Sequence, residues 1–236
     1  KENDTKLTPY DTSSIVTQIY RLAGNRDMHA FEAFGDDDFS FSIPGLSRFR
    51  VSAYKQRGTM SVVIRIISFS LPNPDELGIP QRIIDFSNFS KGLVLVTGTA
   101  GSGKSTTLAC IIDAINHHYK KHIITLEDPL EFLHRHDQSI VSQREINVDT
   151  ESYVTALRAS LRQSPDVILL GEMRDYETMQ VAMTAAETGH LIFSTLHTIG
   201  AASTIDRIID VFPPNQQHQI AVQLSMVLQA VISQQL

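Results

Sequence analysis

The chain has 236 residues, a length that allows one large domain or two small ones. Its hydrophobic fraction of 42% and charged fraction of 19% are ordinary for a globular protein. The formal net charge of -6 argues against a dedicated nucleic-acid binder, which needs clustered cations. No apolar run approaches the roughly 20 residues that cross a bilayer, so we expect no direct membrane insertion. The single cysteine, Cys110, excludes a disulfide within the chain and fits a reducing cytoplasm.

The first part of the chain, residues 1–70, is predicted to form a small α+β domain. A helix is expected near residues 13–23, followed by strands at 39–43, 48–53 and 62–67 whose residues alternate or are β-branched. Turn signals between these strands favour an antiparallel meander. One helix and a few strands enclose little hydrophobic core, so we expect this part to be stabilised by packing against another domain or chain. Three prolines within residues 71–80 predict a linker.

The most informative segment of the chain, residues 98–106, follows the linker. Its pattern is G-x-x-x-x-G-K-[ST], the phosphate-binding P-loop. An apolar strand is predicted before it and an amphipathic helix after it, which is the context that the motif requires. Lys104 is expected at the β- and γ-phosphates, and Ser105 offers a hydroxyl to Mg²⁺. The residues predicted to bind the nucleotide are Gly98, Thr99, Ala100, Gly101, Ser102, Gly103, Lys104, Ser105 and Thr106.

The remaining chain alternates apolar strands with helical patterns. Strands are predicted at residues 93–96, 122–126, 167–170 and 191–194, and helices at 153–162 and 177–187. The strands are almost continuously apolar, which is typical of a parallel sheet covered on both faces. We therefore predict a doubly wound α/β nucleotide-binding domain over residues 81–236. Residues 215–235 are predicted to form one amphipathic helix.

Two of the predicted strands end in acidic residues. Glu172 follows the strand at 167–170, where a carboxylate beside the P-loop holds Mg²⁺ or its waters. Glu127 and Asp128 follow the strand at 122–126, where one of them is expected to orient the attacking water. The alternative for the second pair is a simple turn at Pro129.

Several histidines and arginines are further candidates. His190 and His197 bracket one strand, and His197 is at the end expected to face the nucleotide. Arg158 and Arg162 are four residues apart, so a helix would place both on one face, either near a phosphate or as solvated surface. Further residues, Arg50 and Arg65, lie in strand-like segments of the first domain, where arginine fingers that reach a neighbouring subunit would explain them.

Four segments together resemble the Walker A, Asp box, Walker B and His box of the type II/type IV secretion ATPase superfamily. These are residues 98–106, 124–131, 167–175 and 188–198, and residues 43–51, 143–145 and 205–213 add to a likeness that is closest to the PilT-type retraction ATPases of type IV pili. The resemblance implies a hexameric ring whose subunits have a PAS-like N-terminal domain and a RecA-like ATPase domain. It also implies that ATP lies between the two domains and beside the next subunit.

The resemblance assigns roles to the candidate residues. Glu127 would activate water and Glu172 would be the Walker B carboxylate, with His197 and His190 as His-box residues. Arg50 and Arg65 would reach the nucleotide from the N-terminal domain, and Arg158 and Arg162 would lie near the phosphates. The strands that open the family's N-terminal domain would precede Lys1, and its C-terminal helices would follow Leu236.

The function predicted from this set is Mg²⁺-dependent ATP hydrolysis by a cytoplasmic homo-hexamer that retracts pili and powers twitching motility. Such a motor would act on a pilus platform protein at the cytoplasmic face of the inner membrane. One alternative is a pilus extension or type II secretion ATPase. Another is a nucleotide-responsive scaffold that hydrolyses ATP weakly, and a DNA translocase is disfavoured by the acidic charge balance.

Overall fold

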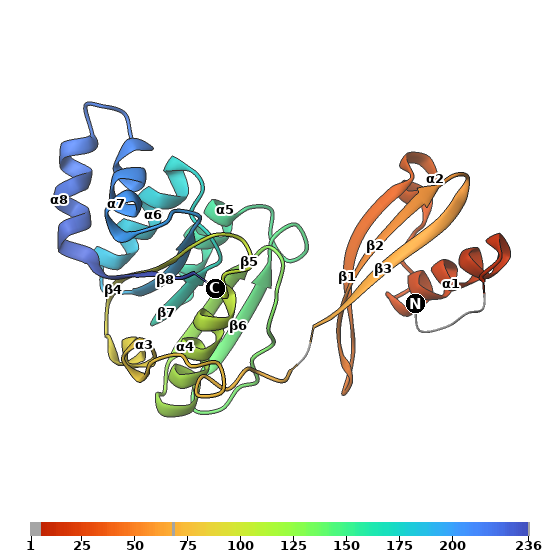
Figure 1. Cartoon of the computed structure of the whole chain (residues 1–236), viewed down its shortest axis with the longest axis horizontal. Coiled ribbons are helices and arrows are strands. Elements are labelled where there is room, and N and C mark those ends of the chain that lie inside the picture. Colours follow the sequence, from red (N-terminus) through yellow and green to blue (C-terminus); the bar gives the residue numbers. More distant parts are fainter. Residues whose placement is uncertain (1–5, 68, 236) are drawn as a thin grey trace. The chain divides into compact units, whose positions relative to one another are not determined.

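The computed structural model describes residues 6–67 and 69–235 (Figure 1). The chain divides into two compact units, Lys1–Ser68 and Phe69–Leu236. The proline-rich segment over residues 71–80, which the sequence marks as a linker, packs against the second unit. Cys110 Sγ donates to the carbonyl oxygen of Pro72 at 3.5 Å, and Ile79 contacts a buried cluster of that unit. Three prolines exclude regular structure there, but they do not exclude apolar packing.

Over residues 6–67, the first unit is a small antiparallel sheet with two helices. Its elements are α1 (Pro9–Leu22), α2 (His29–Phe34), β1 (Asp36–Ile43), β2 (Ser47–Gln56) and β3 (Thr59–Ile67), and the sheet order is β1-β2-β3. The predicted meander is therefore present, with longer strands than expected. The short α2 was not predicted. Its end is set by Gly35, whose φ of 86° is accessible to glycine at little cost.

The second unit is built on a six-stranded parallel sheet. Its strands are β4 (Gly92–Thr97), β5 (His122–Glu127), β6 (Ile140–Glu145), β7 (Val167–Leu170), β8 (Leu191–Leu196) and β9 (Leu228–Ser233), in the order β6-β5-β7-β8-β4-β9. Its helices are α3 (Gln81–Ile84), a 3₁₀ turn (Asp85–Asn88), α4 (Lys104–His118), α5 (Tyr153–Ser160), α6 (Tyr176–Glu187), α7 (Ala201–Asp210) and α8 (Gln217–Val227). The predicted α/β class is confirmed.

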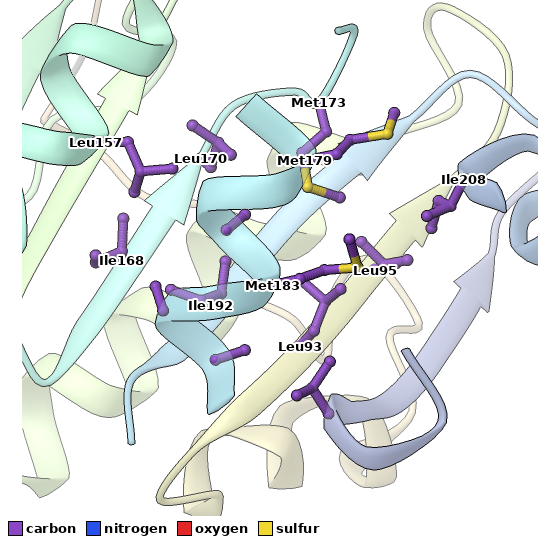
Figure 2. Close-up of a cluster of buried hydrophobic side chains, with 14 of the residues drawn as sticks. Leu93, Leu95, Leu157, Ile168, Leu170, Met173, Met179, Met183, Ile192 and Ile208 are labelled. Carbon is purple, nitrogen blue, oxygen red and sulfur yellow. The ribbon is translucent and has the colours of Figure 1, made fainter. Parts of the chain in front are cut away.

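Helices cover both faces of this sheet, which explains why its central strands are apolar throughout. Successive residues of β4 alternate between the two cores: Leu93 and Leu95 pack with α6, while Val94 and Val96 pack with α4. Figure 2 shows the first core, in which Met179 and Met183 of α6 lie over the strands. A strand buried on both sides cannot show the polar alternation of a half-exposed strand.

The C-terminal segment differs from its prediction. The expected helix over residues 215–235 ends at Val227, and the chain continues as β9 along the outer edge of β4. Val231 packs into one core and Ile232 into the other, so the strand satisfies both faces of the sheet. Short apolar stretches fit a helix or a buried strand equally well, and here the open edge of β4 decides. Further elements of this unit, namely α3, the 3₁₀ turn, β6 and α7, were not predicted.

Candidate functional site

The glycine-rich loop connects the end of β4 to the start of α4. Gly98, Gly101 and Gly103 have φ values of 148°, 79° and 83°. At Gly98 a Cβ atom would lie 2.2 Å from the carbonyl oxygen of Gln234 and 2.6 Å from Ser102 Oγ, so no other residue fits this position. Lys104 opens α4, and its Nζ donates to the carbonyl oxygens of Gly98 (2.9 Å) and Thr99 (2.7 Å). The loop is thus folded around its own lysine.

A cleft of about 420 Å³ lies at the carboxyl ends of the parallel strands, above this loop. Strands β4, β5, β7 and β8 all end there, and the residues that follow them form its walls. This is the position at which open parallel sheets bind their ligands. The lining residues are Ala100, Gly101, Gly103, Lys104, Ser105, Thr106, Glu127, Asp128, Pro129, Glu131, Tyr153, Gly171, Glu172, Arg174, Thr195 and His197.

Glu127 is the last residue of β5, and its carboxyl group is set into the wall of the cleft. Burial raises the pKa of Glu127 to about 7. Nε2 of Gln143, on the neighbouring strand β6, donates to Glu127 Oε1 at 3.5 Å, which partly counteracts the rise. A carboxyl group with a pKa near neutrality is suited to accept a proton from water.

Glu172 follows the end of β7, and its side chain is only 12% exposed. Its Oε2 atom lies 2.5 Å from Arg174 Nε and 3.5 Å from His197 Nε2. The preceding Gly171 is held by Thr195 of β8, whose Oγ1 donates to the Gly171 carbonyl oxygen at 2.6 Å. The carboxylate is therefore placed by two adjacent strands and lies between the Arg174 guanidinium and the His197 imidazole.

Gly171 also matters because the chain approaches it closely from two sides. A Cβ atom there would lie 2.9 Å from Tyr153 Oη and 3.2 Å from the carbonyl oxygen of Leu126. Tyr153 opens α5, and burial together with the negative charge of Glu172 raises the pKa of its phenol, which stays neutral at physiological pH. A glycine in this place lets the ends of β5 and β7 bring Glu127 and Glu172 to one cleft.

Lys104 and the carboxylates influence each other across the cleft. Burial lowers the pKa of Lys104, and the negative charges of Glu131 and Glu172 oppose that decrease. The cleft thus holds cations and carboxylates in one partly enclosed space. A triphosphate with a divalent cation has matching charges, because its phosphates pair with Lys104 and its cation with the carboxylates.

The structure brings most of the predicted residues of this unit to the cleft. Glu127, Glu172 and His197 line it, as do six residues of the loop: Ala100, Gly101, Gly103, Lys104, Ser105 and Thr106. Gly98, Thr99 and Ser102 shape the loop from behind without lining the cleft. Ser102 is buried, and Gly98 and Thr99 present carbonyl oxygens to Lys104.

His190 does not reach the cleft of its own chain. It precedes β8, whereas His197 follows the end of that strand, so the full length of β8 separates them. Its Nδ1 atom lies 3.0 Å from the carbonyl oxygen of Ala185, which fixes the ring at the end of α6. Within this unit His190 therefore lies at the end of β8 that is opposite to the cleft, and its catalytic role stays a prediction.

Arg158 and Arg162 do not share a helix face as predicted. Helix α5 ends at Ser160, because Ser164 with a φ of 53° and Pro165 turn the chain away. Arg158 pairs with Glu177 of α6 at 2.7 Å, and Arg162 donates to the carbonyl oxygen of Arg158 at 3.1 Å. Neither side chain lines the cleft, and a phosphate contact of either arginine stays a prediction.

Arg50 and Arg65 belong to the first unit. They are directly paired across β2 and β3, in a register that puts both side chains on the same face of the sheet. Arg65 is exposed and Arg50 is half-buried. Two adjacent like charges on one face disfavour each other unless an anion lies against them.

Sequence reasoning gave no individual role to several residues in or beside the cleft. Arg174 follows Glu172 by two residues, so the sequence places the two close together. The sequence does not show that the Arg174 side chain turns toward the Glu172 carboxylate. Tyr153 and Thr195 come from α5 and β8, and only the tertiary structure brings them to the cleft. Gln143 was noted as part of a family-like segment, without its contact to Glu127.

A glycine loop between a parallel strand and a helix, with carboxylates at the ends of neighbouring strands, defines the chain as a P-loop α/β protein of the RecA-like type. Residues 9–236 match the model of the type II/IV secretion system protein family. The chain belongs to this family.

Individual relatives agree with this assignment. The chain is 47% identical over 230 residues to the type IV pilus retraction ATPase PilT of Pseudomonas aeruginosa, covering 98% of this chain and 67% of the relative. It is 50% identical over 199 residues to a twitching motility protein of Neisseria gonorrhoeae, covering 84% of this chain and 53% of the relative. A crystal structure of the pilus retraction motor PilT with bound ADP superposes with a TM-score of 0.89 at 47% identity, covering 96% of this chain and 65% of that one.

The chain thus spans between about half and two thirds of the length of these relatives. Among the described residues, 6–67 and 69–235, no helix combines the length and the apolar character needed to cross a bilayer.

Proposed function

We propose that this chain is the ATP-binding and hydrolysing part of a motor that retracts type IV pili. The observation that carries the proposal is the cleft itself, where the P-loop with Lys104 faces Glu127 and Glu172. Relatives that are named for pilus retraction and twitching motility support the choice of mechanical task. A pilus retraction motor that superposes well with this chain holds ADP, which supports an adenine nucleotide as the ligand.

The chemistry of the cleft fits ATP together with Mg²⁺. Phosphate-bound Mg²⁺ typically takes one or two protein ligands and completes its octahedron with phosphate oxygens and waters. Ser105 and Glu172 supply a hydroxyl and a carboxylate in the same cleft, and they are the residues that would hold the ion. Bound there, the ion would neutralise charge that develops on the phosphates.

Three groups of this chain would then act on the substrate. Lys104 would hold the phosphates, and Glu127 would orient a water and take its proton, because its pKa near 7 lets it be ionised and yet basic enough. His197 would report the state of the phosphates to the loop that leads into α7, since it contacts Glu172 and stands just before that loop.

The proposal includes assembly into a homo-hexamer. The first unit has the arginine pair Arg50 and Arg65 on one sheet face. An anion bound against the two guanidinium groups would offset the repulsion between them. The proposal places that anion at a nucleotide phosphate. The hexamer would act at the cytoplasmic face of the inner membrane on a platform protein, and hydrolysis would move rigid units relative to one another.

The direct test is Glu172→Gln. The amide keeps the shape of the side chain but loses the charge that would order Mg²⁺, so we expect nucleotide binding to persist and ATP turnover to fall at least 100-fold. Binding is measured with a fluorescent ATP analogue and turnover by phosphate release. Full turnover in this variant would refute the assigned role of Glu172.

A matched control uses an exposed carboxylate outside the cleft. Glu187→Gln removes an acid at the end of α6, where Glu187 Oε2 accepts from Gln223, and it is expected to leave both binding and turnover unchanged. A similar loss in the two variants would indicate a general effect of charge and not a local one.

A further inference from the structure

The segment that follows Glu127 folds back along the sheet and is held by side-chain amides. The chain turns at Pro129 and passes over the edge strand β6, before β6 itself begins at Ile140. This crossing segment, residues 128–139, contains no helix or strand, so its backbone groups need partners from other elements.

Gln143 supplies two of these partners. Its Oε1 accepts from the His134 backbone N–H at 2.8 Å, and its Nε2 donates to the Phe132 carbonyl oxygen at 2.9 Å. The Phe132 carbonyl and the His134 N–H thus both bond to one side-chain amide. In a sheet, the same two backbone groups would bond to a neighbouring strand. The same Nε2 lies 3.5 Å from Glu127 Oε1.

The register of the sheet explains why one side chain reaches all three groups. Gln143 of β6 is paired with Thr125 of β5, so its side chain is on the same face of the sheet as Thr125 and Glu127. The crossing segment passes over that face. A single amide therefore connects the carboxyl group of Glu127 to the chain five and seven residues further on.

We propose that Gln143 is a positioning residue that sets the orientation of the Glu127 carboxyl group by linking it to the crossing segment. Gln143 is not among the residues that line the cleft, so it acts through Glu127 and not on the nucleotide. The inference rests on the proposed function in so far as Glu127 is the group that activates water.

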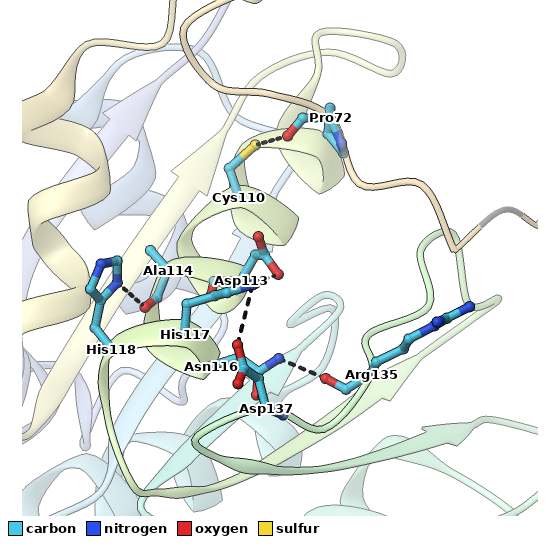
Figure 3. A network of polar contacts seen from close by, with 9 residues as sticks. All are labelled: Pro72, Cys110, Asp113, Ala114, Asn116, His117, His118, Arg135 and Asp137. Atoms are coloured by element: carbon cyan, nitrogen blue, oxygen red, sulfur yellow. Dashed lines mark hydrogen bonds and ion pairs between the residues drawn. The ribbon is translucent and has the colours of Figure 1, made fainter.

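The chain contains a matched control in Asn116. This buried side chain of α4 holds the same crossing segment in the same two-point manner, but further from Glu127. Its Nδ2 donates to the Arg135 carbonyl oxygen at 2.7 Å, and its Oδ1 accepts from the Asp137 N–H at 3.2 Å (Figure 3). If the amides only stabilise the segment, removing either one has the same consequence for catalysis.

The experiment compares Gln143→Met with Asn116→Leu in the full chain. Methionine keeps the length of glutamine and removes its hydrogen bonds. We expect kcat to fall about 10- to 100-fold in Gln143→Met, with the Kd for a fluorescent ATP analogue unchanged within twofold, because misplacing one group by about 1 Å has effects of this size. Asn116→Leu is expected to lower thermal stability but to keep kcat of the folded protein. Equal changes of kcat in the two variants would overturn the proposal.

A second readout needs no hydrolysis and therefore separates this inference from the proposed function. The Glu127 carboxyl carbon is followed by ¹³C NMR as a function of pH and assigned by its loss in Glu127→Gln. Because the amide donates to the carboxylate, its removal is expected to move the Glu127 titration to higher pH, and Gln143→Glu, which adds a carboxylate, is expected to move it further.

Other ionisable groups surround Glu127, but they are identical in all variants: Lys104, Asp128, Glu131, His134, Tyr153 and Glu172. A titration of Glu127 that stays in place in both Gln143 variants would overturn the inference, whether or not the chain hydrolyses ATP. A wild-type chain without ATPase activity would contradict the proposed function. The titration of Glu127 would then still test whether Gln143 positions its carboxyl group.

Discussion

At the scale of single residues, Glu127 combines two requirements that oppose each other. The role proposed for Glu127 needs its carboxyl group to be ionised and close to the phosphates, whereas burial favours the neutral form. Its pKa of about 7 results from a balance between burial, which raises it, and hydrogen bonds to the carboxylate, such as that from Gln143, which lower it. The carboxyl group therefore changes its charge within the physiological pH range.

This balance predicts a pH dependence of hydrolysis. Below about pH 7 Glu127 is increasingly protonated and no longer accepts a proton from water, so kcat is expected to fall on the acid side with a midpoint near 7. The measurement is kcat at saturating ATP between pH 5.5 and 8.5. A rate that stays constant down to pH 5.5 would contradict the role of Glu127.

The same residue predicts an effect on stability. The pKa of Glu127 in the folded state is above its ordinary value of 4.5, so its contribution to stability is fully present below pH 4.5 and is lost as the pH rises through about 7. Glu127→Gln cannot ionise and is expected to gain about 1–3 kcal/mol over the wild type at pH 8, but little at pH 4.5. Urea unfolding at the two pH values measures this difference.

At the scale of elements, β9 brings the end of the described chain into hydrogen-bonding contact with the residues on either side of the P-loop. After β9, the Gln234 N–H donates to the Thr97 carbonyl oxygen at 2.8 Å, and its Oε1 accepts from Thr107 Oγ1 at 3.0 Å. Ser233 Oγ accepts from the Gly200 N–H at 2.9 Å. One short strand thus contacts both the nucleotide loop and the segment after His197.

A pair of glycine substitutions tests how tightly β9 packs. Gly92→Ala would place a Cβ 2.6 Å from Gln229 Cγ and 2.8 Å from the Val227 carbonyl oxygen, where β9 begins. Gly189→Ala is the control, because Gly189 also has a positive φ (106°) but has no atoms within 4 Å of the added Cβ. Both variants bear backbone strain, so only the first should lose a further 1–3 kcal/mol or so from overpacking. Chemical denaturation measures both, and equal losses would mean that β9 yields easily.

At the scale of the whole molecule, the nucleotide cleft and the arginine pair belong to different units. The cleft lies within Phe69–Leu236, and Arg50 and Arg65 lie within Lys1–Ser68. In a ring, each site would receive its arginines from a first unit of the same subunit or of a neighbour. Subunit mixing distinguishes these two arrangements.

Arg50→Ala and Lys104→Ala subunits are each expected to be inactive as pure preparations. If Arg50 acts across an interface, mixing them restores part of the ATPase activity, because an Arg50→Ala site then receives an arginine from its neighbour. The control mixes Lys104→Ala subunits with Glu172→Gln subunits. Lys104 and Glu172 line the same cleft of one chain, so each mixed site still lacks one of them and no activity should return. Absence of recovery at every ratio of the first pair would contradict a role of Arg50 between subunits.

A site residue can be predicted from the sequence when the strand or helix that positions it is adjacent in the chain. The P-loop, Glu127 and Glu172 were predicted because each lies next to the strand that positions it, and parallel strands end at a common edge. The place of His190 and the separate partners of Arg158 and Arg162 depend on contacts between elements, which no short pattern contains.

The sequence by itself therefore determined the class of this protein, its P-loop, and the acids that line the cleft with that loop. Only the tertiary structure decided that residues 228–233 form a strand, that Arg174 and Tyr153 join the cleft, and that Gln143 holds Glu127. The physical reason is that backbone conformation and strand order follow from neighbouring residues, whereas the partner of a side chain depends on which distant segment the sheet places beside it.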